Sequence, residues 1–186
     1  IHSEDELKLI IAESEEGGAI EPNERELIQN VFDFDDRIVR QVMVPRVKIS
    51  GLRADLSITD TMDVVLKEGY SRYPVYEHSL DEIIGIVHAK DIITAYVQQS
   101  GKGLKEVMRP AHFIPESKPI DVLLREFQRR KTQMAIVVSE FGGTIGIVTL
   151  EDILEELVGE IQDEHDHEQQ IVTLLDKQVY QIVAQS

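Results

Sequence analysis

A short phrase occurs twice in the chain, as GIVHAKD at residues 85–91 and as GIVTLED at residues 146–152. The copies stand 61 residues apart, and two further matching segments, VMVP (42–45) and VMRP (107–110), precede them. Two stretches that share phrases near both their ends form an internal repeat, and two copies are too few for a solenoid. The repeat therefore predicts two related units packed as a pseudo-symmetric pair.

Each unit has the pattern of a small mixed sheet with two helices. After the VMxP segment come a short extended piece, an amphipathic helix, two strands and a closing helix. The strands are expected at 73–77 and 83–88 in the first unit, and at 134–138 and 144–149 in the second. The sequence thus predicts an α/β (α+β) fold, a pseudo-two-fold pair of β-α-β-β-α repeats with flanking N-terminal helices.

The units have different flanks. Residues 1–36 are typical of two acidic helices that act as a linker. The repeats are expected at 37–100 and 101–161. Residues 162–186 begin with the polar stretch QDEHDHE and continue as a hairpin that stops early, which indicates a linker and the start of a further domain. We expect the chain to be a fragment of a longer protein.

Charge and composition narrow the classes of function. The formal net charge is −16, from 35 acidic and 19 basic side chains, so we expect no nucleic-acid partner. The chain has no cysteine, which excludes disulfides and thiolate chemistry. We find no nucleophile set of the Ser/His/Asp or Cys/His kind and no paired carboxylates. These features favour a binding module over an enzyme.

The second copy of the phrase carries a hydroxyl and a carboxylate at cap spacing. Thr149 ends a strand and Asp152 lies three residues into the next helix, so the pair is expected to cap that helix. The same two groups could instead bind a ribose diol, because acidic residues read ribose hydroxyls in nucleotide sites. In the first copy His88 replaces the threonine, which leaves Asp91 without a hydroxyl partner.

Three longer segments resemble a known family: FDFDDRIVRQVMVPR (32–46), GYSRYPVY (69–76) and EFGGTIGIVTLEDILEELVGEI (140–161). The two units resemble a pair of cystathionine β-synthase (CBS) repeats, a Bateman module. The segments resemble more closely the cytosolic module of the CorC/HlyC family, relatives of the CNNM magnesium transporters. This resemblance implies magnesium or cobalt efflux, controlled by a Mg-nucleotide held in the module.

The resemblance also implies partners and a location. A transmembrane domain of the same protein would precede the acidic helices, and a small domain would follow the repeats. The module would lie at the cytoplasmic face of the cell membrane. It would form a flat homodimer through the helices of its CBS repeats.

The resemblance implies a nucleotide pocket that draws on both repeats. Its residues would be Ile49, Ser50, Tyr70, Ser71, Arg72, Tyr73, Pro74, Val75, Thr149 and Asp152. Pro74 and Val75 could form an apolar wall for adenine, and Tyr70 or Tyr73 could stack on the base. Packing in the hydrophobic core is the alternative role for all four of these residues.

Two arginines are candidates for binding phosphate. Arg72 and Arg46 could each donate a fork of hydrogen bonds to phosphate oxygens, or could instead form a surface ion pair. We expect no metal ligand directly from the protein. Mg²⁺ would enter with ATP, because a cation relieves the repulsion between a polyanion and an acidic chain. The stretch DEHDHE (163–168) has ligand types without fixed spacing and is not expected to bind metal.

A weaker second pocket would be the pseudo-symmetric counterpart of the first. It would use Asp91, Met134, Ala135 and Ile136. Two other functions stay open: a sensor of AMP or an S-adenosyl ligand, and a dimerisation module that binds no ligand.

Overall fold

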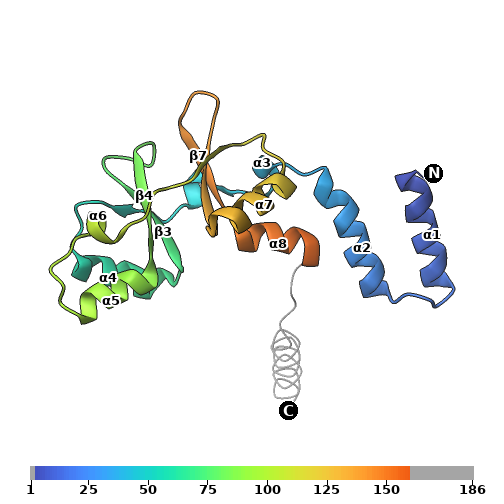
Figure 1. Ribbon diagram of the computed structural model, residues 1–186, viewed down its shortest axis with the longest axis horizontal. Coiled ribbons are helices and arrows are strands. Elements are labelled where there is room, and N and C mark those ends of the chain that lie inside the picture. The colour runs from blue at the N-terminus through green and yellow to red at the C-terminus, as the bar shows by residue number, and fades with distance from the viewer. Residues whose placement is uncertain (1–2, 160–186) are drawn as a thin grey trace, which may run out of the picture.

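The computed structural model describes residues 3–159 (Figure 1). The hairpin expected within 162–186 and the polar stretch before it lie outside the described residues. The helices are α1 (Glu4–Glu16), α2 (Pro22–Asp35), α3 (Val39–Val42), η1 (Arg46–Lys48), α4 (Ile58–Glu68), α5 (Ala89–Val97), α6 (Leu104–Val107), α7 (Ile120–Arg130) and α8 (Leu150–Val158). The strands are β1 (Val44–Pro45), β2 (Leu52–Arg53), β3 (Arg72–Tyr76), β4 (Ile83–His88), β5 (Phe113–Pro115), β6 (Met134–Val138) and β7 (Thr144–Thr149).

The two units form two mixed sheets, which confirms the predicted fold class. The first sheet has the order β2-β3-β4 and the second the order β1-β7-β6-β5. In both, an antiparallel hairpin (β3 with β4, β6 with β7) is joined by a short parallel strand, β2 or β5. Three of the four hairpin strands have the expected bounds, and β3 begins and ends one residue earlier than predicted.

The leading segment of each unit crosses to the sheet of the other unit. β1 belongs to the leading segment of the first unit, yet it pairs with β7 of the second, with Pro45 opposite Gly146. In the second unit, Arg109 of VMRP exchanges two backbone hydrogen bonds with Ile86 of β4, at 2.9 and 2.8 Å. Each sequence repeat is therefore not a separate structural unit, because a segment from the other repeat completes its sheet.

This crossing explains the glycine that begins both copies of the repeated phrase. A Cβ atom on Gly146 would lie 2.7 Å from the sulfur of Met43 and 2.7 Å from the carbonyl oxygen of Val44. A Cβ atom on Gly85 would lie 2.7 Å from the sulfur of Met108 and 2.8 Å from the carbonyl oxygen of Arg109. Only glycine lets the crossing segment approach so closely.

Three clusters of buried side chains hold the molecule together. One surrounds the second sheet and includes Val39 of the first repeat, one surrounds the first sheet and includes Leu104 of the second repeat, and the third joins the faces of the two sheets. The third cluster contains Ile83, Ile86, Met134, Ile136 and Ile147. Since it draws on β4, β6 and β7, it packs the two repeats against each other.

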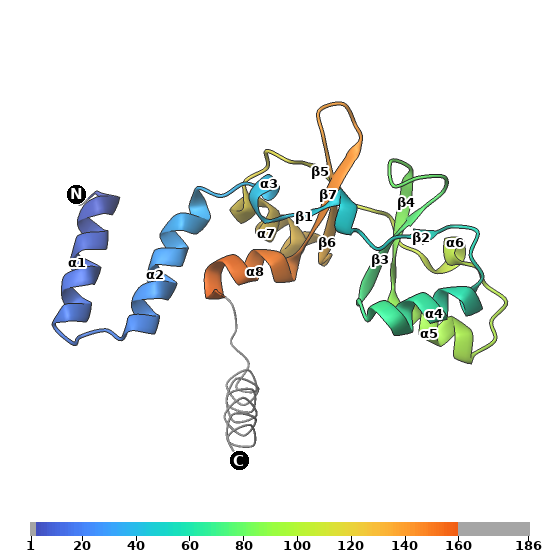
Figure 2. The same ribbon diagram turned by 180° about the vertical axis from the view of Figure 1, so that it is seen from behind.

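The acidic residues before the repeats form the predicted pair of helices, α1 and α2, which extend away from the two sheets (Figures 1 and 2). Phe34 of α2 is buried in the core of the second repeat, and Asn30 Nδ2 donates to the carbonyl oxygen of Leu157 at 3.3 Å. α1 has no buried residue and lies beside α2. Among residues 3–159, no helix has both the length and the apolar character needed to cross a bilayer.

Candidate functional site

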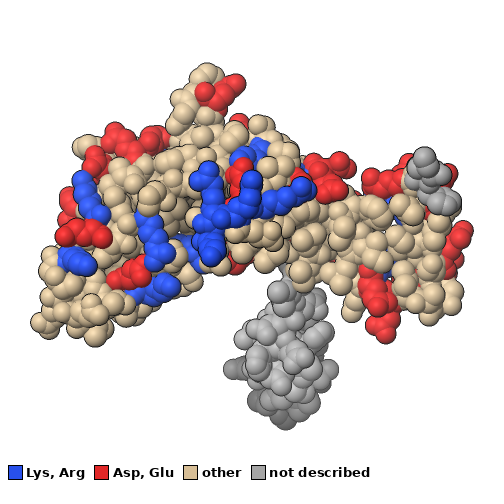
Figure 3. Space-filling view, in the orientation of Figure 1, with Lys and Arg blue, Asp and Glu red and all other residues tan. Residues whose placement is uncertain are grey.

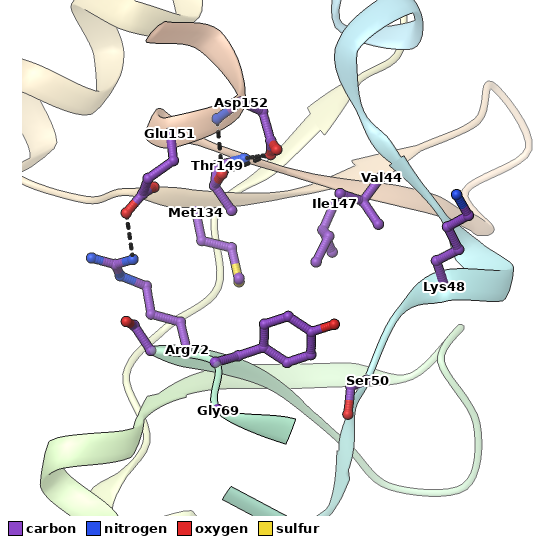
Figure 4. A pocket seen from close by; sticks show the side chains of 12 residues that line it. Val44, Lys48, Ser50, Gly69, Arg72, Met134, Ile147, Thr149, Glu151 and Asp152 are labelled. Atoms are coloured by element: carbon purple, nitrogen blue, oxygen red, sulfur yellow. Dashed lines mark hydrogen bonds and ion pairs between the residues drawn. The ribbon is translucent and has the colours of Figure 1, made fainter. Parts of the chain in front are cut away.

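A cavity of about 420 Å³ lies between the two repeats, where β3 begins and β7 ends (Figure 4). Its size is in the range of sites for small molecules. It is lined by Val44, Lys48, Ser50, Gly69, Tyr70, Ser71, Arg72, Met134, Ile147, Thr149, Glu151 and Asp152. The cavity brings together six residues of the predicted first pocket: Ser50, Tyr70, Ser71, Arg72, Thr149 and Asp152.

Thr149 and Asp152 form a capping box at the start of α8. The backbone N–H of Asp152 donates to Thr149 Oγ1 at 3.2 Å. In return, the backbone N–H and the hydroxyl of Thr149 donate to Asp152 Oδ2 at 2.7 and 2.6 Å. The cap expected from the spacing is thus confirmed, and the capped pair also lines the cavity. The two side chains that cap α8 therefore also form a polar edge of the candidate ligand site.

Arg72 is the dominant cation of the cavity. Its side chain is only 13% exposed, and Nη1 donates to Glu151 Oε1 at 3.2 Å. Its Nε is buried and has no hydrogen-bond partner among the described residues. A buried donor without a partner is unfavourable by about 1–3 kcal/mol, and a ligand oxygen would relieve it. Lys48 lies on the other side of the cavity (Figure 4).

The tyrosines have different environments. Tyr70 lines the cavity and is 53% exposed, so its ring is accessible to a ligand. Tyr73 is fully buried, and its hydroxyl accepts a hydrogen bond from the backbone N–H of Tyr70 at 3.0 Å. Burial raises the pKa of the Tyr73 phenol. Of the two candidates for stacking, Tyr70 is therefore the one in position, and Tyr73 supports it from the core.

Four predicted residues do not line this cavity. Tyr73, Pro74 and Val75 are buried in β3, and Ile49 packs against the cluster between the sheets. Their placement matches the core-packing alternative. The apolar wall of Pro74 and Val75 stays a prediction, because both side chains are buried in β3 and do not line this cavity.

Arg46 also lies outside the cavity lining. Both terminal nitrogens of its guanidinium bind the carboxylate of Asp81, and Nη1 also donates to the carbonyl oxygen of Thr144 at 2.8 Å. The pKa of the Asp81 carboxyl is lowered by this hydrogen bond from Arg46. Arg46 therefore forms the ion pair that was its alternative role, and it joins the first repeat to the second.

The structure does not assemble the second pocket as expected. Asp91 Oδ2 accepts from Arg109 Nη2 at 2.9 Å and lines a separate hollow beside α5. Met134 lines the first cavity, while Ala135 and Ile136 are fully buried in β6. The pKa of His88 is lowered by burial and by the positive charges of Arg109 and Arg72.

Some lining residues were missed in the sequence. They are Val44, Lys48, Gly69, Ile147 and Glu151, together with Met134, which was assigned to the other pocket. Val44 and Lys48 reach the cavity because β1 crosses to the second sheet, which no local pattern indicates. Glu151 stands inside the repeated phrase, between two residues that were assigned. Its position next to Asp152 could have indicated that it also lines the cavity.

Comparison with known proteins gives the family. The model of the CBS domain matches the chain twice, at residues 39–98 and 104–159. The chain belongs to the CBS-domain family. The CBS pair is similar to the CBS domain of the bacterial CNNM/CorC family Mg²⁺ transporter, with 43% identity and a TM-score of 0.80, over 88% of this chain and 100% of that chain. The pair is thus of the CNNM/CorC type.

Two further relatives extend this comparison. A CBS domain of the bacterial CNNM/CorC family Mg²⁺ transporter in complex with ATP has 41% identity and a TM-score of 0.71, over 75% of this chain and all of that chain. The UPF0053 protein YugS of Bacillus subtilis is 41% identical over 167 residues, which cover 90% of this chain and 39% of that protein. The chain thus spans about two-fifths of the length of YugS.

Proposed function

We propose that the CBS pair binds an adenine nucleotide, ATP with Mg²⁺, in the cavity between its repeats. The observation that carries this proposal is Arg72, a buried guanidinium with an unpartnered Nε, which faces the same cavity as the capped Thr149–Asp152 pair. The proposal is supported by the complex of a similar transporter CBS domain with ATP. The module is a binding module and not an enzyme.

The polar groups of the cavity match the parts of a nucleotide. Tyr70 stacks on the base, and Thr149 and Asp152 hydrogen-bond to the ribose. Arg72 binds phosphate oxygens as a fork, and Lys48 adds a second positive charge. Mg²⁺ would be held by the phosphates, and when bound it neutralises part of their charge.

The distribution of charge favours such a ligand more than the net charge does. Residues 3–36 carry twelve acidic and two basic side chains, whereas residues 37–159 carry 17 acidic and 16 basic ones. On the face shown in Figure 3, Lys and Arg gather over the repeats, and Asp and Glu dominate on α1 and α2. An anionic ligand therefore meets a nearly neutral CBS pair, because charges more than about 8 Å away are screened.

The proposed role is control of a magnesium or cobalt efflux transporter. Both repeats line the cavity, so a ligand that binds one arrangement of the repeats more tightly shifts the population toward it. We propose that the module forms a homodimer through its CBS helices and lies at the cytoplasmic face of the membrane. It would transmit its state through α1 and α2 to the transmembrane domain of its own protein.

Calorimetric titration of the 186-residue chain tests the nucleotide proposal. We expect ATP to bind with Mg²⁺ and more weakly without it, and Arg72→Met to weaken binding at least tenfold. AMP and S-adenosylmethionine are the comparison ligands, and tighter binding of either would replace ATP in the proposal. An absence of heat with all of them, with an unchanged melting temperature, would favour the ligand-free dimerisation module.

A further inference from the structure

We infer that the loop between β3 and β4 carries a site for a divalent transition-metal ion such as Zn²⁺, with Glu77, His78 and Glu82 as its ligands (Figure 1). The three side chains are exposed, and one ligand atom from each lies within 4.8 Å of the other two. Ligand atoms around one Zn²⁺ are about 3–4 Å apart, because each lies about 2.0–2.2 Å from the ion. Small rotations of exposed side chains therefore place all three on one ion. The site departs from the expectation that the protein provides no metal ligand of its own.

The kinds of donor atom decide the class of ion. One imidazole nitrogen and two carboxylates suit Zn²⁺ and its neighbours in the first transition row, whereas Mg²⁺ prefers oxygen ligands alone. Three protein ligands also leave coordination positions for water. A hollow of about 550 Å³ beside Glu77 and His78 gives this water room. One cation of this hollow, Arg53, is already held by Asp55 at 2.5 Å.

Hydrogen bonds hold the backbone of the loop in place. The N–H of Glu77 donates to the carbonyl oxygen of Glu82 at 3.1 Å, and the N–H of Glu82 donates to that of Ser79 at 2.9 Å. The N–H of Asp81 donates to Ser79 Oγ at 3.2 Å, and Asp81 Oδ1 accepts from the N–H of Thr144 in the second repeat at 3.1 Å. An ion therefore has to order only the three side chains, which reduces the entropic cost of binding.

The turn itself does not require these three residue types. In the first hairpin the N–H of Glu77 donates to the carbonyl oxygen of Glu82, and in the second the N–H of Ser139 donates to that of Gly143 at 2.9 Å. The second hairpin thus closes with the same backbone bond, although Ser139 and Gly143 stand where the first has two carboxylates. The ligand set is therefore a property of the first hairpin and not of the repeat.

Two contacts compete with the ion. His78 Nδ1 lies 2.5 Å from Glu82 Oε2, and Lys105 Nζ donates to Glu77 Oε1 at 2.7 Å. The ion takes the place of the proton between His78 and Glu82, which is released to water. Lys105 is 56% exposed, so it can turn into the solvent at low cost when the ion binds Glu77. Removal of Lys105 should therefore strengthen the site.

The metal site is separate from the nucleotide cavity. Arg72, which lines the cavity, begins β3, whereas Glu77 follows the other end of that strand. Five residues of strand at about 3.3 Å each place the two about 16 Å apart. Binding of the metal ion can therefore be measured without any nucleotide.

The test is a calorimetric titration of the 186-residue chain with Zn²⁺, in excess Mg²⁺ and without nucleotide. His165 and His167 lie outside the described residues and could bind Zn²⁺ themselves, so both are replaced by Gln in a reference chain that serves as the background for every variant. We expect the reference chain to bind one Zn²⁺. His78→Gln should weaken binding at least about tenfold, because loss of a ligand costs no less than loss of an outer-shell partner.

Three further variants separate a site from general attraction to an acidic chain. Glu82→Gln should weaken Zn²⁺ binding as His78→Gln does, whereas Glu140→Gln, which removes the same charge from the exposed turn of the second hairpin, should leave the Kd unchanged. Lys105→Met should tighten binding about two- to fivefold, a gain that loss of folding cannot produce.

Two results would overturn the inference: no Zn²⁺ binding to the reference chain, or an unchanged Kd for His78→Gln. Equal weakening by Glu82→Gln and Glu140→Gln would also overturn it, because Zn²⁺ would then follow the overall negative charge. None of these results bears on the proposed nucleotide site, since no nucleotide is present.

Discussion

At position 149 a single hydroxyl both caps a helix and lines the cavity. Thr149 Oγ1 accepts from the N–H of Asp152 and donates to the carboxylate of Asp152, so it is oriented before any ligand arrives. A ligand that uses this edge does not have to order it, which reduces the entropic cost of binding. In the first repeat His88 stands at this position and makes no side-chain cap bond.

Thr149→Ala should therefore have two effects. Loss of the cap should lower the free energy of unfolding by about 1 kcal/mol, and loss of the hydroxyl should weaken ATP binding about tenfold. Urea unfolding and calorimetry measure the two effects on the same variant.

Ser57→Ala is the matched control for this variant. Ser57 caps α4 with an equivalent bond, in which its hydroxyl accepts from the N–H of Asp60 at 3.1 Å, and it does not line the cavity. Ser57→Ala should lower the free energy of unfolding by a similar amount and leave the affinity for ATP unchanged. If both variants bind ATP as the parent chain does, the hydroxyl of Thr149 serves the helix alone.

At the scale of the elements, the crossing of β1 decides which residues meet. Thr149, Asp152, Arg72 and Tyr70 were predictable because they stand in recognisable phrases that end or begin strands. Lys48 was not predictable, because it lies in η1, directly after a strand that joins the sheet of the other repeat.

Arg46 illustrates a different limit of the sequence. It was a reasonable phosphate ligand by residue type. Its partner, Asp81, lies 35 residues away and meets it only in the folded chain. The helices, sheets and repeat follow from periodicity along the chain, whereas the pairing of charged side chains depends on packing between elements.

The close approach of the crossing strand makes Gly146 sensitive to substitution. Gly146→Ala should lower the free energy of unfolding by about 1–3 kcal/mol, because a methyl group would overlap Met43 and Val44. Gly143→Ala is the control: there a methyl group would meet Asp81 Oδ1 at 3.4 Å, an ordinary contact. Equal costs for the two variants in urea unfolding would contradict this account of the glycine.

A half-buried ionic cluster joins α7 to the segments before it. Lys118 Nζ donates to both carboxylate oxygens of Glu126 at 2.7 and 2.8 Å, and His112 Nε2 lies 3.0 Å from Oε2. These hydrogen bonds, with that from Lys118 the largest, lower the pKa of the Glu126 carboxyl. Its ionised form is therefore stabilised by folding.

The stability from Glu126 should depend on pH. A lowered pKa stabilises the fold fully above the unfolded value of about 4.5 and loses this effect as the pH falls through the folded pKa. Glu126→Gln should cost about 1–3 kcal/mol at pH 7, and its unfolding curve should converge with that of the parent chain in acid. Glu116→Gln, at the more exposed pair with Arg40, should cost less than about 1 kcal/mol. A cost for Glu126→Gln that is the same at pH 7 and pH 3 would refute the assignment.

At the scale of the whole molecule, apolar side chains remain exposed on the helices of the first repeat. They are Leu66 on α4 and Ile93, Tyr96 and Val97 on α5. α4 and α5 lie side by side at the end of the molecule opposite α1 (Figures 1 and 2). Such a patch supports the proposed dimer through the CBS helices.

The dimer should be sensitive to a charge in this patch. Val97 is 72% exposed, and Val97→Glu should give a monomer where the parent chain is a dimer in sedimentation velocity. Val47→Glu is the control, because Val47 is 92% exposed in η1 and lies outside the patch. A dimer that survives Val97→Glu would place the interface elsewhere.

The exchanged strands also bear on how such a chain could arise. One repeat by itself has a leading segment that pairs with a sheet other than its own, as β1 does with β7. A single-repeat ancestor could complete its sheet only by giving this segment to a second copy and receiving one in return. Gene duplication and fusion would then have joined two chains that were already interlocked. Gly85 and Gly146 would then mark the contacts between the two ancestral chains, because each lies where the crossing segment packs on the other repeat's sheet.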